Sequence, residues 1–133
     1  GNNSQKQQHL SDLVAGNRMF AFGLSEPGRG SDAANPEVVA TRDGEHFILR
    51  GEKCWSTNAA WASHIVVHAL TDPDGRNGHR STCFIIPRDR EGVHYQEMEG
   101  KTVWPLSSTG SIALDGVKAD AGDILGDLDG GFE

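Results

Sequence analysis

Hydrophobic positions at the start of the chain follow a helical spacing. Leu10, Leu13 and Val14 fall on one face of a helix, because residues three and four apart are neighbours on a helical surface. Ser4 and Gln7 form a capping-box pattern ahead of them. The pattern therefore predicts one short helix at the N-terminus, with an apolar face available for packing.

From about residue 18 the pattern changes to short apolar or alternating runs bounded by turn residues, which is typical of β-strands. A hairpin is predicted around Asp43-Gly44, and residues 71–78 form a turn-rich loop. The strand candidates are residues 19–25, 38–41, 46–51, 53–58, 64–70, 81–86, 93–98 and 111–119. Short strands at this spacing predict a mostly β fold, a small β-barrel or sandwich, after the short N-terminal helix.

Composition narrows the class of protein. The 133 residues carry a formal net charge of −7, which argues against a nucleic-acid partner, because phosphate binding needs clustered Lys and Arg. The apolar runs are strand-sized and the first residues are polar, so we expect no membrane span, no leader and a cytoplasmic location. Cys54 and Cys83 are expected to be buried, reduced thiols, and the absence of Cys-x-x-Cys and His-Glu-x-x-His gives no metal site.

Residues 28–33 match the G-x-G-x-x-A form of a dinucleotide fingerprint. That fingerprint must open a helix facing the pyrophosphate, whereas Pro36 and predicted hairpins follow here, so the Rossmann interpretation is rejected. A P-loop is excluded because no Lys-Ser/Thr follows the glycines. Two interpretations remain: a glycine-rich loop whose N–H groups and Ser25 and Ser31 hydroxyls approach an anion, or a surface turn.

Trp55 and Thr57 are expected to share one face of a strand, because side chains alternate along it. Such a face can stack on a flat ring and hydrogen-bond its edge, but a core Trp beside a Thr is the alternative. His64 and His68 also share a strand, so surface or structural roles are expected for them rather than catalysis.

The two stretches together resemble one family. Residues 24–32, Leu-Ser-Glu-Pro-Gly-Arg-Gly-Ser-Asp, are similar to the Thr-Glu-Pro-Gly-x-Gly-Ser-Asp signature of the acyl-CoA dehydrogenases. Residues 53–58, Lys-Cys-Trp-Ser-Thr-Asn, resemble that family's Lys-x-Trp/Phe-Ile-Thr-Asn element, and residues 42–51 resemble its Asp-Gly hairpin. The stretches 5–13 and 126–132 resemble the end of its N-terminal helical domain and the entry to its C-terminal bundle.

The resemblance implies three parts: residues 1–17 from the N-terminal helical domain, a middle β domain over 18–120, and a lead-in over 121–133 to a C-terminal helical domain. It implies FAD as cofactor, with Thr57 near the reactive ring nitrogen and Gly30 and Ser31 near the phosphates. The implied cofactor-binding residues are Phe22, Leu24, Ser25, Gly30, Ser31, Trp55, Ser56 and Thr57, and the implied substrate residues are Ser31 and Thr71.

The implied reaction is oxidation of an acyl thioester across its α and β carbons. The family's base is a Glu of the C-terminal bundle, so no catalytic residue is expected in this chain, and the isolated chain is expected to be inactive. Implied partners are an acyl-CoA or acyl-carrier-protein substrate, an electron-transfer flavoprotein or oxygen, and further copies of the chain in a homo-oligomer.

One stretch departs from the family. Residues 102–109 match its Met-Gly-x-Arg-x-Ser-Asp-Thr element with Pro105 and Ser108 in place of the Arg and the Asp. The departure favours a divergent branch that uses carrier-protein thioesters or oxygen. A flavin-dependent monooxygenase of the same fold, and a non-catalytic β-sandwich binding module, stay open as alternatives.

Overall fold

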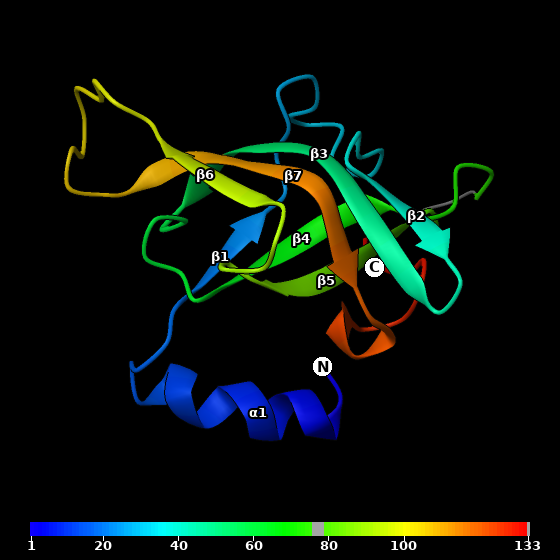
Figure 1. Cartoon of the computed structure of the whole chain (residues 1–133). Helices are drawn as coiled ribbons and strands as arrows, with labels where there is room; N and C mark the ends of the chain where they lie inside the picture. Colours follow the sequence, from blue (N-terminus) through cyan, green and yellow to red (C-terminus); the bar gives the residue numbers. More distant parts are fainter. Residues whose placement is uncertain (76–78, 133) are drawn as a thin grey trace.

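The computed structural model describes residues 1–75 and 79–132 as a curved β-sheet with one helix packed beneath it (Figure 1). The elements are α1 (Asn3–Val14), β1 (Phe20–Gly23), β2 (Val39–Asp43), β3 (His46–Thr57), β4 (His64–Leu70), β5 (Ser81–Pro87), β6 (Val93–Glu97), β7 (Thr109–Ala119), the 3₁₀ turn η1 (Ala121–Asp123) and β8 (Ile124–Leu125). The predicted mostly β class with a short N-terminal helix is therefore confirmed.

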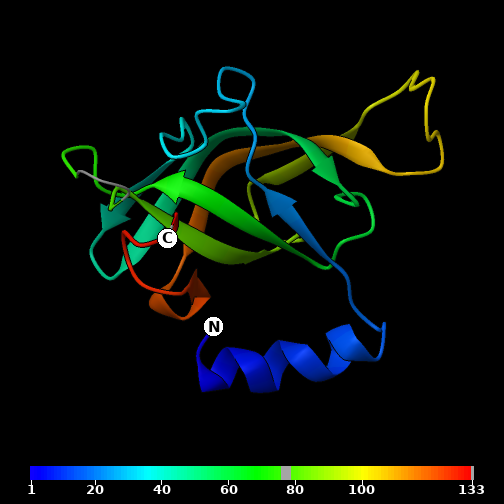
Figure 2. The same cartoon turned by 180° about the vertical axis from the view of Figure 1, so that it is seen from behind.

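The described strands form one eight-stranded sheet in the order β6-β7-β3-β2-β4-β5-β8, with β1 added in parallel beside β4. The sheet curls on itself, as the two opposite views show, but its ends do not pair, so the barrel is not closed (Figures 1 and 2). The β1–β2 loop lies on the side of the sheet away from α1 in both views.

The Asp43-Gly44 hairpin is present, with Asp43 paired to His46 and Gly44 at a φ of 61°, a conformation that costs glycine little. The separate strands expected at 46–51 and 53–58 are one strand, β3. The split prediction is wrong because β7 pairs with β3 along both halves. Irregular register between Lys53 and Ser56 interrupts the ladder without ending the strand.

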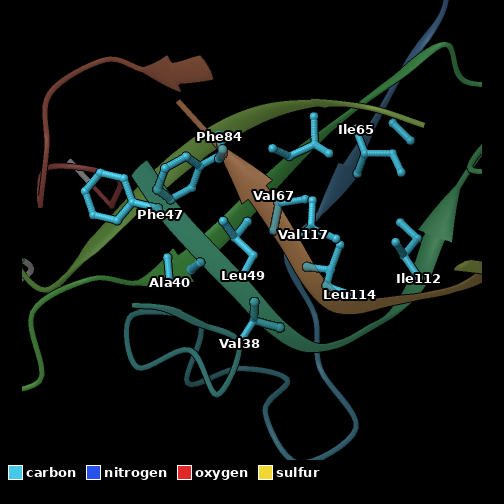
Figure 3. Packing of buried hydrophobic residues seen from close by; sticks show 14 of the residues in the cluster. Val38, Ala40, Phe47, Leu49, Ile65, Val67, Phe84, Ile112, Leu114 and Val117 are labelled. Atoms are coloured by element: carbon cyan, nitrogen blue, oxygen red, sulfur yellow. The ribbon is translucent and has the colours of Figure 1, made fainter. Parts of the chain in front are cut away.

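The hydrophobic core lies inside the curve of the sheet (Figure 3). Leu49, Ile65, Val67 and Phe84 are each 0% exposed. Leu49, Ile65 and Val67 stand at alternating positions of β3 and β4, whereas Phe84 lies in β5, where residues 81–86 are all buried. Full burial of a side chain of this size contributes roughly 1.5–3 kcal/mol, so the core fixes which face points outward in each strand that alternates.

Helix α1 differs from its expected form. Its capping box joins Asn2 and Gln5 rather than Ser4 and Gln7, because the Asn2 side chain accepts the Gln5 N–H at 2.9 Å while Gln5 accepts the Asn2 N–H at 3.0 Å. The helix is buried through Gln5 and His9, whereas Leu10 and Val14 are 49% and 88% exposed. The predicted apolar face is thus only partly covered: Leu10 and Leu13 line a hollow that also borders β4 and β5, while Gln5 is fastened to the backbone of residues 122–124.

The loop expected over 71–78 begins as predicted after β4, and its residues 76–78 lie outside the described part of the chain. Cys54 and Cys83 are free thiols, the second buried and the first half-buried. No helix of the described residues is long and apolar enough to cross a membrane.

Candidate functional site

The β1–β2 loop, residues 24–38, begins with a tight turn. Glu26 and Arg29 exchange backbone hydrogen bonds at 2.9 and 3.1 Å. The Arg29 guanidinium then pairs with Asp32 at 2.7 Å and Glu37 at 3.2 Å. The described loop forms turns and no helix. A dinucleotide fingerprint would have to open a helix, so the Rossmann interpretation was correctly rejected.

A buried ion pair fastens this loop to β3. The Lys53 ammonium lies 2.7 Å from Glu26 Oε1, and the two side chains are 0% and 1% exposed. The Glu26 carboxylate also accepts the backbone N–H groups of Glu37, at 2.5 Å, and Val38, at 2.8 Å. Because a buried carboxylate requires partners of this kind, the pair fixes both ends of the loop against the core.

Burial lowers the pKa of the Lys53 ammonium, and the hydrogen bond and charge of Glu26 oppose that shift. From the sequence, Glu26 and Lys53 are only letters of two motifs, and neither was predicted to have a site role. The one sequence signal for this ion pair was that each motif carries a charged residue of opposite sign beside its predicted binding residues. The fold brings these two residues, which are 27 positions apart, into contact.

Strand β3 changes conformation just after Lys53. Trp55 has a φ of 59°, which is an outlier for a bulky residue, and it stands at the register shift between Lys53 and Ser56. Trp55 is 61% exposed and Thr57 is exposed, so the core-Trp alternative is wrong. Both reach solvent through the bulge rather than by the predicted alternation, because Lys53, two positions before Trp55, is buried. Such strain persists where surrounding structure enforces it, here the bulge between Lys53 and Ser56.

Ser56 points the other way from Trp55. It is 2% exposed, and its hydroxyl has no hydrogen-bond partner among the described residues. Its cofactor-binding role therefore stays a prediction. Because the side chain is buried, Ser56 would have to contact the cofactor through its backbone.

A hollow of about 400 Å³ lies beside Trp55. Its lining also includes Cys54 and Met98, with Glu52 and Glu99 among its acidic residues. Burial and the nearby carboxylate of Glu52 raise the pKa of the Cys54 thiol, so this cysteine is held in its neutral form.

The end of β1 and the residues after it reach the same region from the other motif. Phe22 is 51% exposed, and Leu24 and Ser25 are half-buried. The Cys54 N–H donates to the Ser25 carbonyl at 2.9 Å, which places Ser25 directly beside the residue that precedes Trp55. Among the ring contacts of the described residues, none joins Phe22 to Trp55.

Gly30 and Ser31 lie further out in the loop, and both are exposed. A Cβ built on Gly30 would meet nothing within 4 Å, and Gly30 is not among the glycines with positive φ. Neither backbone conformation nor packing among the described residues therefore requires a glycine at position 30. A remaining reason for the glycine is that another molecule approaches the backbone closely there.

Thr71 lies at the end of β4, and its hydroxyl is already used. It hydrogen-bonds to Thr82 and Asp129, which fastens the segment after β8 to β5. The neighbouring Arg80 donates to Asn35 at 2.8 Å, so this region touches the β1–β2 loop. The substrate role of Thr71 stays a prediction.

The described residues contain no group of three or more His, Cys, Asp or Glu side chains able to hold a metal ion.

Comparison with known proteins gives a consistent set of relatives. The family model described as acyl-CoA dehydrogenase, middle domain, matches residues 21–117. A probable acyl-CoA dehydrogenase of Bacillus subtilis (strain 168) is 37% identical over 135 residues, covering 100% of this chain and 35% of that protein. The 3-(aryl)acrylate reductase of Clostridium sporogenes (strain ATCC 15579) is 38% identical over 133 residues, covering 99% and 35%.

Solved structures agree with these relatives. An acyl-CoA dehydrogenase from Geobacillus kaustophilus superposes with a TM-score of 0.93 at 32% identity, over 99% of this chain and 35% of that one. A glutaryl-CoA dehydrogenase from Mycobacterium smegmatis in complex with FADH2 gives 0.85 at 35% identity, over 93% and 31%. The chain thus spans about a third of the length of the proteins it matches.

Proposed function

Because this chain belongs to the acyl-CoA dehydrogenase family, we propose that it supplies one wall of an FAD site in an oxidoreductase acting on the α,β carbon–carbon bond of an acyl thioester. The observation that carries the proposal is the buried Glu26–Lys53 pair. It holds the loop bearing Leu24 and Ser25 against the strand bearing Trp55, so that the two signature segments form one surface.

The exposed groups on this surface fit a flavin. Trp55 and Phe22 expose large apolar surfaces to solvent. Because this surface is not buried, it adds nothing to the hydrophobic stabilisation of the isolated fold. Thr57 and Ser25 offer hydrogen-bond donors, and the open approach to Gly30 beside Ser31 suits a phosphate. FAD, when bound, would supply the two-electron acceptor that protein side chains lack.

Within this chain the proposed roles are therefore binding and orientation. Phe22, Leu24 and Trp55 would exclude water from the ring, and Ser25 and Thr57 would orient it. Ser31 would reach both a phosphate and the thioester. The base that removes the α proton belongs, by the family resemblance, to a C-terminal helical domain outside these residues.

The wider assignment follows the same reasoning. We propose that residues 18–120 are the middle domain, flanked by parts of two helical domains, in a cytoplasmic homo-oligomer. We propose an acyl-CoA as substrate, because the family includes a relative named as a short-chain specific acyl-CoA dehydrogenase and a solved structure named for glutaryl-CoA. One relative is named as a reductase of 3-arylacrylates, so the assay must determine the direction of reaction.

The first test compares the 133-residue chain with a full-length protein that carries it. The full-length protein should hold FAD and reduce an artificial electron acceptor with an acyl-CoA. The 133-residue chain should bind FAD weakly and show no turnover, because a site with one wall loses buried contact area. Tight stoichiometric FAD binding or turnover by the short chain would contradict this division of roles, and oxygen consumption would favour a monooxygenase.

The second test concerns Trp55 in the full-length protein. Trp55→Ala should lower FAD retention several-fold, because a stacked aromatic ring contributes roughly 0.5–1.5 kcal/mol beyond its buried area. Trp61→Ala is the matched control, since Trp61 is 74% exposed and lies after β3. FAD content per protein after gel filtration is the measurement.

Thr57→Val keeps the shape of the side chain and removes its hydroxyl. FAD should stay bound, while the rate of flavin reduction changes by up to about tenfold, the effect expected from one hydrogen bond. Thr41→Val, on an exposed position of β2, is the control. If Trp55→Ala and Thr57→Val both keep the FAD content, flavin spectrum and reduction rate of the parent, the flavin site lies elsewhere.

A further inference from the structure

We propose that the buried Lys53 ammonium tunes the flavin site from inside the protein, acting through the single peptide group that joins Leu24 to Ser25. Lys53 would be a positioning and polarising residue, because it never reaches the surface where the cofactor binds. The proposal takes its ligand, FAD, from the proposed function, and it adds a determinant of electron affinity that lies behind the binding surface.

The first step is the orientation of the ammonium. Lys53 is 0% exposed, and its Nζ donates to the Leu24 carbonyl at 3.1 Å and to Glu26 Oε1 at 2.7 Å. Glu26 is itself held by the N–H groups of residues 37 and 38. The charge therefore has a fixed position relative to the 24–25 peptide.

The second step follows from peptide geometry. The chain has no cis peptide bond in its described residues, so the carbonyl and N–H of the 24–25 peptide point in opposite directions. The Leu24 carbonyl points inward to Lys53, and the Ser25 N–H therefore points away from the buried pair. In residues 1–75 and 79–132, no group accepts a hydrogen bond from the Ser25 N–H.

The third step is electrostatic. A positive group on the carbonyl end polarises the peptide and strengthens its N–H as a donor, and the low dielectric of the interior increases the effect. The Ser25 carbonyl is occupied separately by the Cys54 N–H at 2.9 Å, so Ser25 cannot rotate away. The result is a preorganised, strengthened donor that faces outward from the β1–β2 loop.

A donor of this kind favours the more electron-rich of two ligand states. Two-electron reduction increases the negative charge on a flavin ring, so the Ser25 N–H would bind the reduced form more tightly than the oxidised form. Lys53, acting through this peptide, would therefore raise the midpoint potential of the bound cofactor.

The experiment uses the full-length protein with FAD bound. The double variant Glu26→Gln/Lys53→Met removes both buried charges and the donor to Leu24, while the introduced amide oxygen can still accept one of the N–H groups of residues 37 and 38, which donate to separate carboxylate oxygens in the parent. The preference for reduced over oxidised FAD should fall about two- to tenfold, the range for one hydrogen bond, and tenfold equals about 30 mV for a two-electron couple. Glu45→Gln/Lys118→Met removes the same charges from exposed positions and should leave the potential unchanged.

A second variant separates the loss of the Lys53 ammonium from the loss of the buried ion pair. Glu26→Gln alone keeps Lys53 and its bond to Leu24, so its midpoint potential should stay above that of the double variant. An unchanged potential in the double variant, or an equal fall in Glu26→Gln, would overturn the proposal. A folded double variant that no longer holds FAD would also overturn it, because the pair would then shape the site rather than tune it. Failure of the parent protein to hold FAD would instead refute the proposed function.

Discussion

Protonation of His68 is expected to destabilise the folded chain as the pH falls. His68 is 1% exposed on β4, and its Nε2 lies 2.6 Å from the Ser81 hydroxyl. Its Nδ1 is buried and has no partner among the described residues. Burial first, and the Lys53 ammonium second, lower the pKa of His68 from 6.5 to about 4.

The sign and size of the effect follow from this shift. The unfolded chain takes up a proton near pH 6.5, whereas the folded chain resists protonation until about pH 4. Stability is therefore intact above pH 6.5 and is lost as the pH falls toward 4. A shift from 6.5 to about 4 corresponds to about 3 kcal/mol at 1.36 kcal/mol per pKa unit.

Urea unfolding of the parent and His68→Gln at several pH values between 7 and 4 measures this loss. Glutamine retains a polar contact for Ser81 but does not titrate, so the variant should lose about 3 kcal/mol less than the parent over this range. His94→Gln, on an exposed position of β6, should follow the parent. Parallel pH profiles for His68→Gln and the parent would refute the reasoning.

Two further predictions concern the packing around β3. Lys53→Met should lower the free energy of unfolding by about 3–5 kcal/mol, because it leaves Glu26 buried without its counter-charge, and Glu26→Gln/Lys53→Met should recover part of that loss in a denaturation double-mutant cycle. Gly51→Ala should cost roughly 1–3 kcal/mol, because φ is 131° and the added Cβ would lie 3.0 Å from the Val38 backbone. Gly122→Ala has open space and should be neutral in thermal melts, and equal melting temperatures for the two alanine variants would contradict this account.

The strands were predictable because they depend on local periodicity. The Asp43-Gly44 hairpin needs only a glycine at positive φ between alternating runs. The burial of β4 and β5 on both faces, by contrast, depends on what α1 and the 129–132 segment cover, which sequence periodicity does not encode.

The rest of the site depends on long-range contacts. Alternation from the buried Phe47, Leu49 and Lys53 would turn Trp55 inward. The register shift against β7, where Trp55 has a φ of 59°, turns it outward instead. The Glu26–Lys53 pair could not be anticipated from hydrophobic pattern, because both residues would be assigned to the surface by their charge. The error in α1 has a similar origin, since Gln5 is buried by its bonds to Gly122 and Ile124.

Those two bonds have a consequence for how the β domain can be exchanged between proteins. The Gln5 side chain donates to the Gly122 carbonyl at 3.1 Å and to the Ile124 carbonyl at 2.7 Å, so α1 and the segment from η1 to β8 meet at one junction. Both acceptors are main-chain atoms, which every sequence provides. The segment between these two points could be exchanged between relatives with only this one contact to preserve, as in domain insertions whose termini lie close together.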